Sequence, residues 1–101
     1  MENTVILEIF DFLKTKGIAR TESEFSEDWL GCSEGYMRKL RSTGSEPSMG
    51  AIAVCGSRLQ KAGREMASSA RYQQIGMSFL ALSEKCHEQV NRNAIEFDIR
   101  N

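Results

Sequence analysis

Apolar residues recur at three- and four-residue spacing along most of the chain, a period that predicts an all-α protein of about five helices. The first helix is predicted over residues 3–16 and stops at Gly17. Thr21, with Glu24 three residues later, forms a capping box at the start of a second helix that ends near Gly31. The N-terminal third is therefore predicted to hold two helices joined by a short connection.

A third helix is predicted between Ser33, which is placed to cap it, and Gly44, which ends it. Its inward stripe consists of Tyr36, Met37 and Leu40. Ser48 is placed to cap a fourth helix, with a break expected at Gly63. Glycines within this fourth helix lower its intrinsic stability and indicate close contact between backbones.

The longest periodic segment spans residues 66–90, and Met77 and Leu80 add apolar surface outside its main stripe. This surplus suggests a homodimer built on the C-terminal helix, with a curved helix that spans the core as the alternative. Residues 94–100 alternate apolar and charged positions, which is the period of a half-buried strand. This tail either pairs as a strand with its symmetry mate or extends the preceding helix.

The length of 101 residues and the hydrophobic content of 41% are those of one domain, residues 1–101. Residues 1–63 hold the shorter helices, and residues 64–101 hold the C-terminal helix and tail, a candidate dimerisation element. No run approaches the ~20 apolar residues of a membrane span, and the N-terminus lacks the pattern of a signal peptide. We therefore expect a cytoplasmic protein with no membrane partner.

The residues that could support catalysis or metal binding are few. Cys32, Cys55 and Cys86 lack Cys-x-x-Cys spacing and are expected to be reduced thiols, without a disulfide or a metal. His87 follows Cys86, but adjacent residues of a helix point about 100° apart and cannot form a Cys-His pair. The sequence contains no glycine-rich phosphate loop and no paired-carboxylate motif. We expect no cofactor and no enzymatic activity.

Charge is distributed unevenly although the net charge is only −1. Residues 1–34 contain eight acidic and three basic residues, whereas residues 35–75 contain two acidic and seven basic residues. The basic part begins where the third predicted helix begins. A nearly neutral total charge therefore does not exclude a nucleic-acid partner, although it limits affinity at physiological salt.

The sequence around the second and third helices resembles a known DNA-binding family. Gly31-Cys32-Ser33, Met37 four residues after Ser33, Leu40, and the later Pro47-Ser48 are similar to the phage-repressor helix-turn-helix family (Cro/C1, XRE-type). The resemblance covers about Thr21 to Leu59 and implies a bacterial or phage regulator that inserts its third helix into the major groove. By position, the DNA-contacting residues of the family correspond to Ser33, Glu34, Gly35, Arg38, Lys39 and Ser42.

The residues themselves support the same surface. Arg38 and Arg41 lie about one turn apart and are suited to bidentate contacts with guanine or phosphate. Ser33 and the first N–H groups of the third helix could hold a phosphate. Arg58 and Lys61, with Arg64, either contact the DNA backbone or are ordinary solvated cations.

Two functions follow as hypotheses. The first is a small transcriptional regulator that binds duplex DNA through its third helix, as a homodimer with two third helices about 34 Å apart on a palindromic site. The second is a non-enzymatic adaptor or antiactivator that uses the same fold to bind a transcription factor. Its basis is the acidic second helix, which carries Glu22, Glu24, Glu27 and Asp28 and would repel a phosphate backbone.

Overall fold

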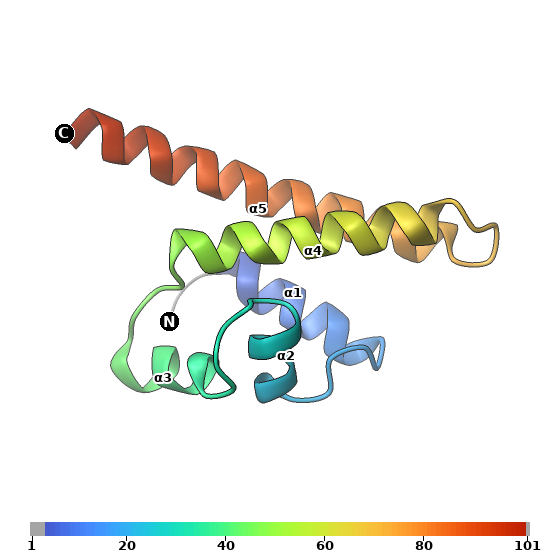
Figure 1. Cartoon of the computed structure of the whole chain (residues 1–101), viewed down its shortest axis with the longest axis horizontal. Coiled ribbons are helices and arrows are strands. Elements are labelled where there is room, and N and C mark those ends of the chain that lie inside the picture. The colour runs from blue at the N-terminus through green and yellow to red at the C-terminus, as the bar shows by residue number, and fades with distance from the viewer. Residues whose placement is uncertain (1–3, 101) are drawn as a thin grey trace.

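The computed structural model describes residues 4–100, and within this range it contains five α-helices and no strand (Figure 1). The helices are α1 (Thr4–Thr15), α2 (Glu22–Asp28), α3 (Tyr36–Thr43), α4 (Met49–Ala67) and α5 (Gln73–Arg100). The all-α prediction with a long C-terminal helix is confirmed. Residue 3, the predicted start of the first helix, lies outside the described residues.

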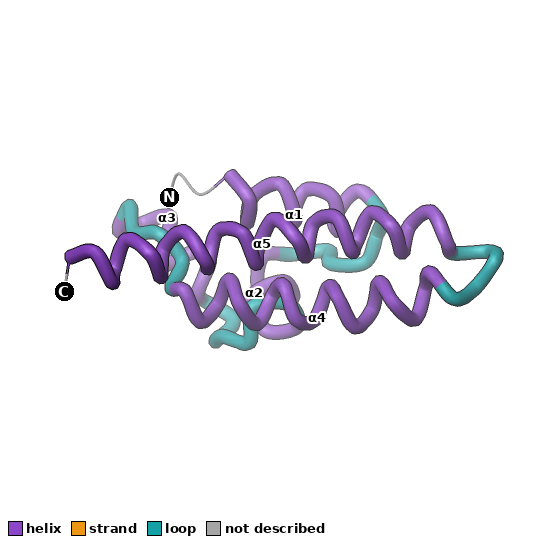
Figure 2. The backbone as a smooth tube through the Cα atoms, turned by 90° about the horizontal axis from the view of Figure 1, so that it is seen from above, coloured by secondary structure: helices purple, strands orange, loops and turns teal. Residues whose placement is uncertain are grey.

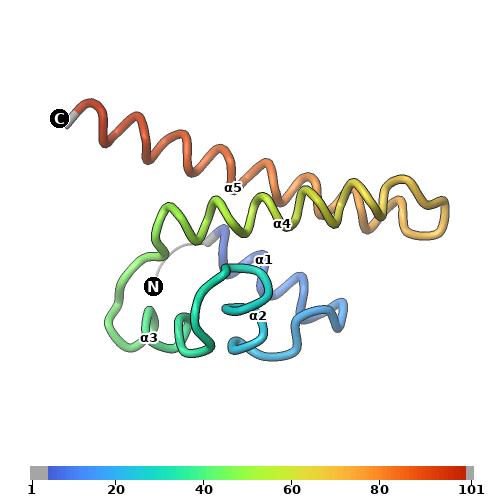
Figure 3. The backbone as a smooth tube through the Cα atoms, in the orientation of Figure 1, coloured from blue at the N-terminus to red at the C-terminus, as the bar shows by residue number. Residues whose placement is uncertain are grey.

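The two long helices form an antiparallel hairpin, and the three short helices pack on one side of it (Figures 1 and 2). The chain reverses in the loop of residues 68–72, at the end of the molecule opposite the C-terminus (Figure 3). α5 then continues past the start of α4 (Figure 1). α3 lies on the side of the molecule away from α5, so the predicted DNA-contacting helix and the candidate dimerisation helix are well separated.

The hydrophobic core lies between the hairpin and the short helices. Its fully buried large side chains include Ile6, Ile9 and Leu13 of α1, Phe25 and Leu30 at α2, Met37 of α3, Ile52 and Leu59 of α4, and Phe79 of α5. Phe12 and Trp29 meet the ring of Phe79 edge-on, with centroids 5.7 and 5.9 Å from it. Each short helix thus contributes apolar side chains to one shared core.

Glycines bring the backbones of α4 and α5 into direct contact. A Cβ on Gly76 would lie 2.5 Å from the Ala67 nitrogen and 2.8 Å from the Gly63 oxygen, which leaves no room for a side chain. A Cβ on Gly56 would lie 2.9 Å from Cβ of Cys86. The buried Ser83 hydroxyl donates to the Gly56 carbonyl at 2.7 Å and ties the helices further. The close backbone packing that Gly50 and Gly56 predicted for the fourth helix is therefore present at Gly56, whereas Gly50 is exposed.

Several predicted boundaries are confirmed at the level of hydrogen bonds. Thr21 Oγ1 accepts from the Glu24 N–H and Ser48 Oγ accepts from the Ala51 N–H, both at 3.1 Å. Gly17, Gly31 and Gly44 all have positive φ, of 72°, 66° and 66°, which L-residues with a side chain rarely adopt. These are the three glycines that the sequence placed at the ends of the first three helices.

Two predicted boundaries are wrong. Ser33 does not cap α3, because the cap position is Gly35 and makes no side-chain cap hydrogen bond. α4 does not break at Gly63, because this glycine faces Gly76 inside the hairpin and the helix continues to Ala67. The segment predicted as a helix from residue 66 is consequently interrupted by the loop of residues 68–72.

The C-terminal tail is helical, so the strand alternative for residues 94–100 is wrong and the helix extension is confirmed. Ile95, Phe97 and Ile99 are 59%, 62% and 79% exposed, so the last turns present apolar side chains on more than one side. A strand would need a partner strand, and residues 4–100 contain none.

Candidate nucleic-acid interface

α3 is held in position by hydrogen bonds at its first turn. The buried Ser26 hydroxyl of α2 accepts from the Met37 N–H at 3.2 Å and donates to the Glu22 carbonyl at 2.8 Å. The Tyr36 hydroxyl accepts from the Ser48 N–H at 2.9 Å, which ties α3 to the start of α4. Met37 and Leu40 are buried beneath. These contacts fix one face of α3 against the domain and leave the other face outward.

The connection between α2 and α3 is seven residues long, 29–35, and Arg58 of α4 stabilises it. Arg58 Nη1 donates to the carbonyls of Glu27 and Asp28, at 2.9 and 2.8 Å, and so satisfies the C-terminal end of α2. A Cβ on Gly31 would lie 3.1 Å from Cγ1 of Val54 and 3.4 Å from Nη2 of Arg58. Arg58 therefore has a structural role at the turn. The sequence suggested only that it contacts the DNA backbone or is a solvated cation.

The outward face of α3 gathers the basic residues of the predicted motif. Arg38, Lys39, Arg41 and Ser42 are all exposed. Arg41 forms an ion pair with Glu22 of α2, with 60% of its side chain exposed. Ser42 Oγ donates to the Lys39 carbonyl at 3.1 Å. Arg38 and Lys39 are consequently the two cations of this face for which no acidic partner is seen among the described contacts.

Three further predicted site residues lie in the turn that precedes α3. Ser33 and Glu34 are exposed and Gly35 is half-buried in the turn that precedes α3, next to Arg38, whose Nη2 lies 3.4 Å from the position of a Cβ on Gly35. The Tyr36 N–H donates to the Ser33 carbonyl at 3.1 Å and the Met37 N–H to Ser26, so two of the N–H groups proposed to hold a phosphate already have partners.

Lys61 and Arg64 belong to a different region of the surface. The start of α4 is tied to α3 through Ser48 and Tyr36, and Lys61 lies 13 residues further along the helix. At 1.5 Å per residue this is about 20 Å along the axis. The structure therefore brings Ser33, Glu34, Gly35, Arg38, Lys39, Arg41 and Ser42 together, whereas Lys61 lies one turn beyond Arg58, which contacts the α2–α3 connection, and Arg64 lies further along α4.

α2 borders the basic face with acidic side chains. Glu27 and Asp28 are exposed, whereas Glu22 and Glu24 are half-buried. Glu24 also pairs with Arg20 at 3.5 Å. Because Glu22 already pairs with Arg41, the boundary between α2 and α3 is a junction of opposite charges.

The cysteines lie apart from this surface. The buried Cys55 and Cys86 hydrogen bond to each other across the hairpin, and this bond together with burial raises the pKa of Cys55. Burial raises the pKa of the Cys32 thiol, and the nearby Arg58 guanidinium partly offsets that rise. The three thiols are free. The half-buried His87 lies against Gly56. A Cβ on Gly56 would lie 3.1 Å from the His87 imidazole.

Comparison with known proteins places the chain in a family without assigning an activity. The model of a family of unknown function, DUF6626, matches residues 6–98. The chain belongs to this family. The match extends over all five helices, so the α2–α3 pair and the α4–α5 hairpin are both part of the family unit. No curated protein and no solved structure matches the chain.

Among residues 4–100, no helix is both long and apolar enough to cross a membrane. Among these same residues, no three His, Cys, Asp or Glu side chains are grouped as metal ligands would be.

Proposed function

We propose that this protein is a small regulator that binds duplex DNA through the outward face of α3. The observation that carries the proposal is the exposed cluster of Arg38, Lys39 and Arg41 on a short helix whose opposite face is buried. Such a helix fits the major groove, which admits one α-helix, and Arg and Lys are the residues that most often contact guanine there. The proposed regulator acts in the cytoplasm as a homodimer.

The rigid attachment of α3 supports the proposal. Binding of a helix in a groove loses affinity when the helix must first be ordered. Here the first turn is held by Ser26 and Tyr36, and Leu40 anchors the next turn in the core. α3 can therefore present Arg38 and Lys39 without rearrangement of its backbone, whereas Arg41 must first leave its ion pair with Glu22.

The test is fluorescence anisotropy with a labelled random-sequence duplex at low ionic strength. We expect measurable binding that weakens steeply with salt, because each phosphate neutralised adds about 0.9 to the slope of log K against log salt. Changing Arg38 and Lys39 together to Ala should reduce affinity at least about tenfold and lower that slope by about two. The double variant Lys14→Ala and Lys16→Ala is the matched control, because it removes the same charge from the end of α1.

Two outcomes decide the proposal. If the wild type fails to bind duplex at any salt concentration, DNA is not the ligand. If both double variants lose affinity equally, binding reflects net charge rather than α3.

One observation favours an adaptor as the second candidate function. The Arg41–Glu22 ion pair and the exposed Glu27 and Asp28 place both signs of charge at the α2–α3 junction. A mixed-charge surface suits a protein partner, where complementary charges set specificity, better than a uniformly anionic backbone. Two results together would support this candidate. The protein would fail to bind duplex DNA at low salt, and it would bind a transcription factor captured from the native host. The Glu27→Lys variant would lose the binding to that transcription factor.

A further inference from the structure

We propose that the outward face of α5 is a self-association surface, on which a second copy of this chain packs antiparallel with Glu88 at its centre. This inference specifies the interface of the homodimer proposed above, and it holds whether or not DNA is the ligand.

The face is a continuous stripe along α5. Residues at alternating four- and three-residue steps lie on one side of a helix, and here they are Met77, Ala81, Glu84, Glu88, Asn91 and Ile95, with Ile99 one turn further. All seven are exposed. Figure 2 looks down on α5, and none of the other described helices and loops crosses over it. The stripe is therefore uncovered along its whole length.

Apolar side chains are exposed at both ends of the stripe. Met77, Ile95 and Ile99 are 58%, 59% and 79% exposed, and the stripe places them at its two ends. The core needs none of them, because α5 contacts the core through its opposite side, which carries Phe79 and Cys86.

The order of residues along the stripe is symmetric about Glu88. Met77 lies eleven residues before it and Ile99 eleven after, Ala81 and Ile95 lie seven away, and Glu84 and the exposed Arg92, which borders the stripe beside Asn91, lie four away. An antiparallel copy centred at Glu88 thus sets apolar residues against apolar residues at both ends. It also sets Glu84 against Arg92 of the second copy, and the two-fold axis repeats this pair. Isologous self-complementarity of this kind is what a two-fold dimer requires.

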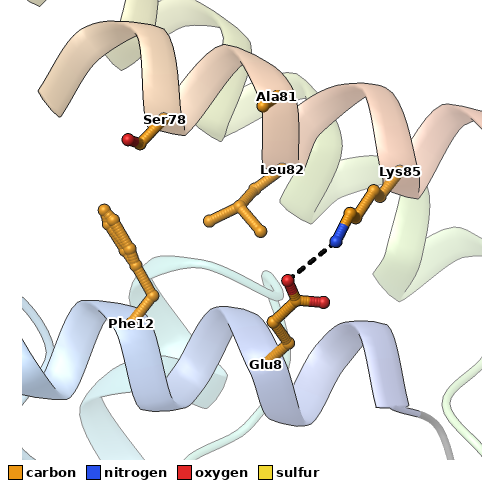
Figure 4. Close-up of a pocket in the computed structure, with 6 residues that line it drawn as sticks. All are labelled: Glu8, Phe12, Ser78, Ala81, Leu82 and Lys85. Carbon is orange, nitrogen blue, oxygen red and sulfur yellow. Dashed lines mark hydrogen bonds and ion pairs between the residues drawn. The ribbon is translucent and has the colours of Figure 1, made fainter. Parts of the chain in front are cut away.

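A groove beside the stripe provides room for the apolar ends. It lies between α1 and α5, has a volume of about 280 Å³, and is lined by Glu8, Phe12, Ser78, Ala81, Leu82 and Lys85 (Figure 4). The Lys85–Glu8 ion pair, at 2.8 Å, bridges the two helices at one end of the groove. Ala81 belongs to both the groove and the stripe, so Ile95 of the second copy, which faces Ala81, lies at the apolar rim.

The experiment measures the mass of the full chain by sedimentation velocity over a concentration series, without DNA. We expect a dimer of twice 11.4 kDa that dissociates on dilution. Glu84→Arg and Arg92→Glu should each weaken the dimer about tenfold or more, because each places two like-charge pairs in the interface. The two substitutions combined in one chain should restore the dimer to within about threefold of wild type, because the pairs re-form with reversed sign.

Further variants separate this arrangement from others. Glu88→Gln should tighten the dimer, because it removes the one like-charge contact that the two-fold axis creates. Ile95→Ser should weaken it. Glu96→Arg is the matched control, since Glu96 is exposed on α5 but off the stripe, and it should leave the dimer unchanged. Circular dichroism confirms that each variant stays folded.

A monomer at every concentration overturns the proposal and indicates that the stripe binds a different protein. A dimer that the combined Glu84→Arg and Arg92→Glu variant fails to restore overturns the antiparallel arrangement. Neither result depends on DNA, so failure of this proposal and failure of DNA binding are separate outcomes.

Discussion

At the scale of single residues, Ser26 takes the role that the sequence predicted for Ser33, because its hydroxyl accepts a hydrogen bond from the first turn of α3. Its hydroxyl is fully buried, accepts from the Met37 N–H and donates to the Glu22 carbonyl. We expect Ser26→Ala to lower the free energy of unfolding by about 1–3 kcal/mol, because the buried Met37 N–H is left without a partner. Urea unfolding measures this, with the exposed Ser57→Ala as the control within about 0.5 kcal/mol of wild type. A loss no larger than that of the control would show that Ser26 does not hold α3.

The exposed site residues could be found from the sequence, whereas their supports could not. Arg38, Lys39 and Arg41 stand out because charge of one sign gathers on one predicted helix. The role of Arg58 depends on the carbonyls of Glu27 and Asp28, about 30 residues away in sequence. No local pattern reports such a contact. The same holds for the Tyr36–Ser48 bond, which only the folded chain creates.

At the scale of elements, glycines decide how closely the hairpin helices approach, and a comparison of the buried Gly76 with the exposed Gly50 tests this. We expect Gly76→Ala to destabilise the protein by about 2–3 kcal/mol, because the added Cβ would meet the backbone atoms of Ala67 and Gly63. Gly50→Ala should instead stabilise it by up to about 1 kcal/mol, because Gly50 is exposed in α4 and its Cβ would approach only Ser48 Oγ, at 3.9 Å. Urea unfolding of both variants measures the difference. Equal effects would mean that backbone contact does not limit the hairpin.

The same glycines explain which elements the sequence predicted and which it did not. Gly17, Gly31 and Gly44 end segments whose periodicity also stops, so local signals agree there. Gly63 carries the same local signal, but its lack of a side chain serves the contact with Gly76 and the helix continues. Residues 94–100 have the alternation of a strand, yet they continue the helix that begins at Gln73, and the described part of the chain offers no partner strand. Tertiary contacts decided both cases, and sequence periodicity contains no information about them.

At the scale of the whole molecule, the two proposed surfaces lie on opposite sides, and this changes how a dimer could use them. α3 lies on the side away from α5 (Figure 1). If two copies pair through α5, the two α3 helices therefore lie on opposite outer sides of the dimer, with both α4–α5 hairpins between them. The proposed dimer therefore does not suit two adjacent major grooves of one palindromic site, and each α3 is expected to contact DNA independently.

This independence gives a prediction that joins the two proposals. Glu84→Arg, which should dissociate the dimer, is expected to leave affinity for a duplex of about 12 bp within about twofold of the wild-type value, because α3 is untouched. For longer duplexes the variant should also lose little, whereas helices that bind one duplex as a pair would gain about 10²–10⁴ in affinity from their linkage. Anisotropy titrations of wild type and Glu84→Arg with short and long duplexes measure this. A loss of a hundredfold on the long duplex alone would show that the α5 dimer places both α3 helices on one duplex, and would contradict their independence.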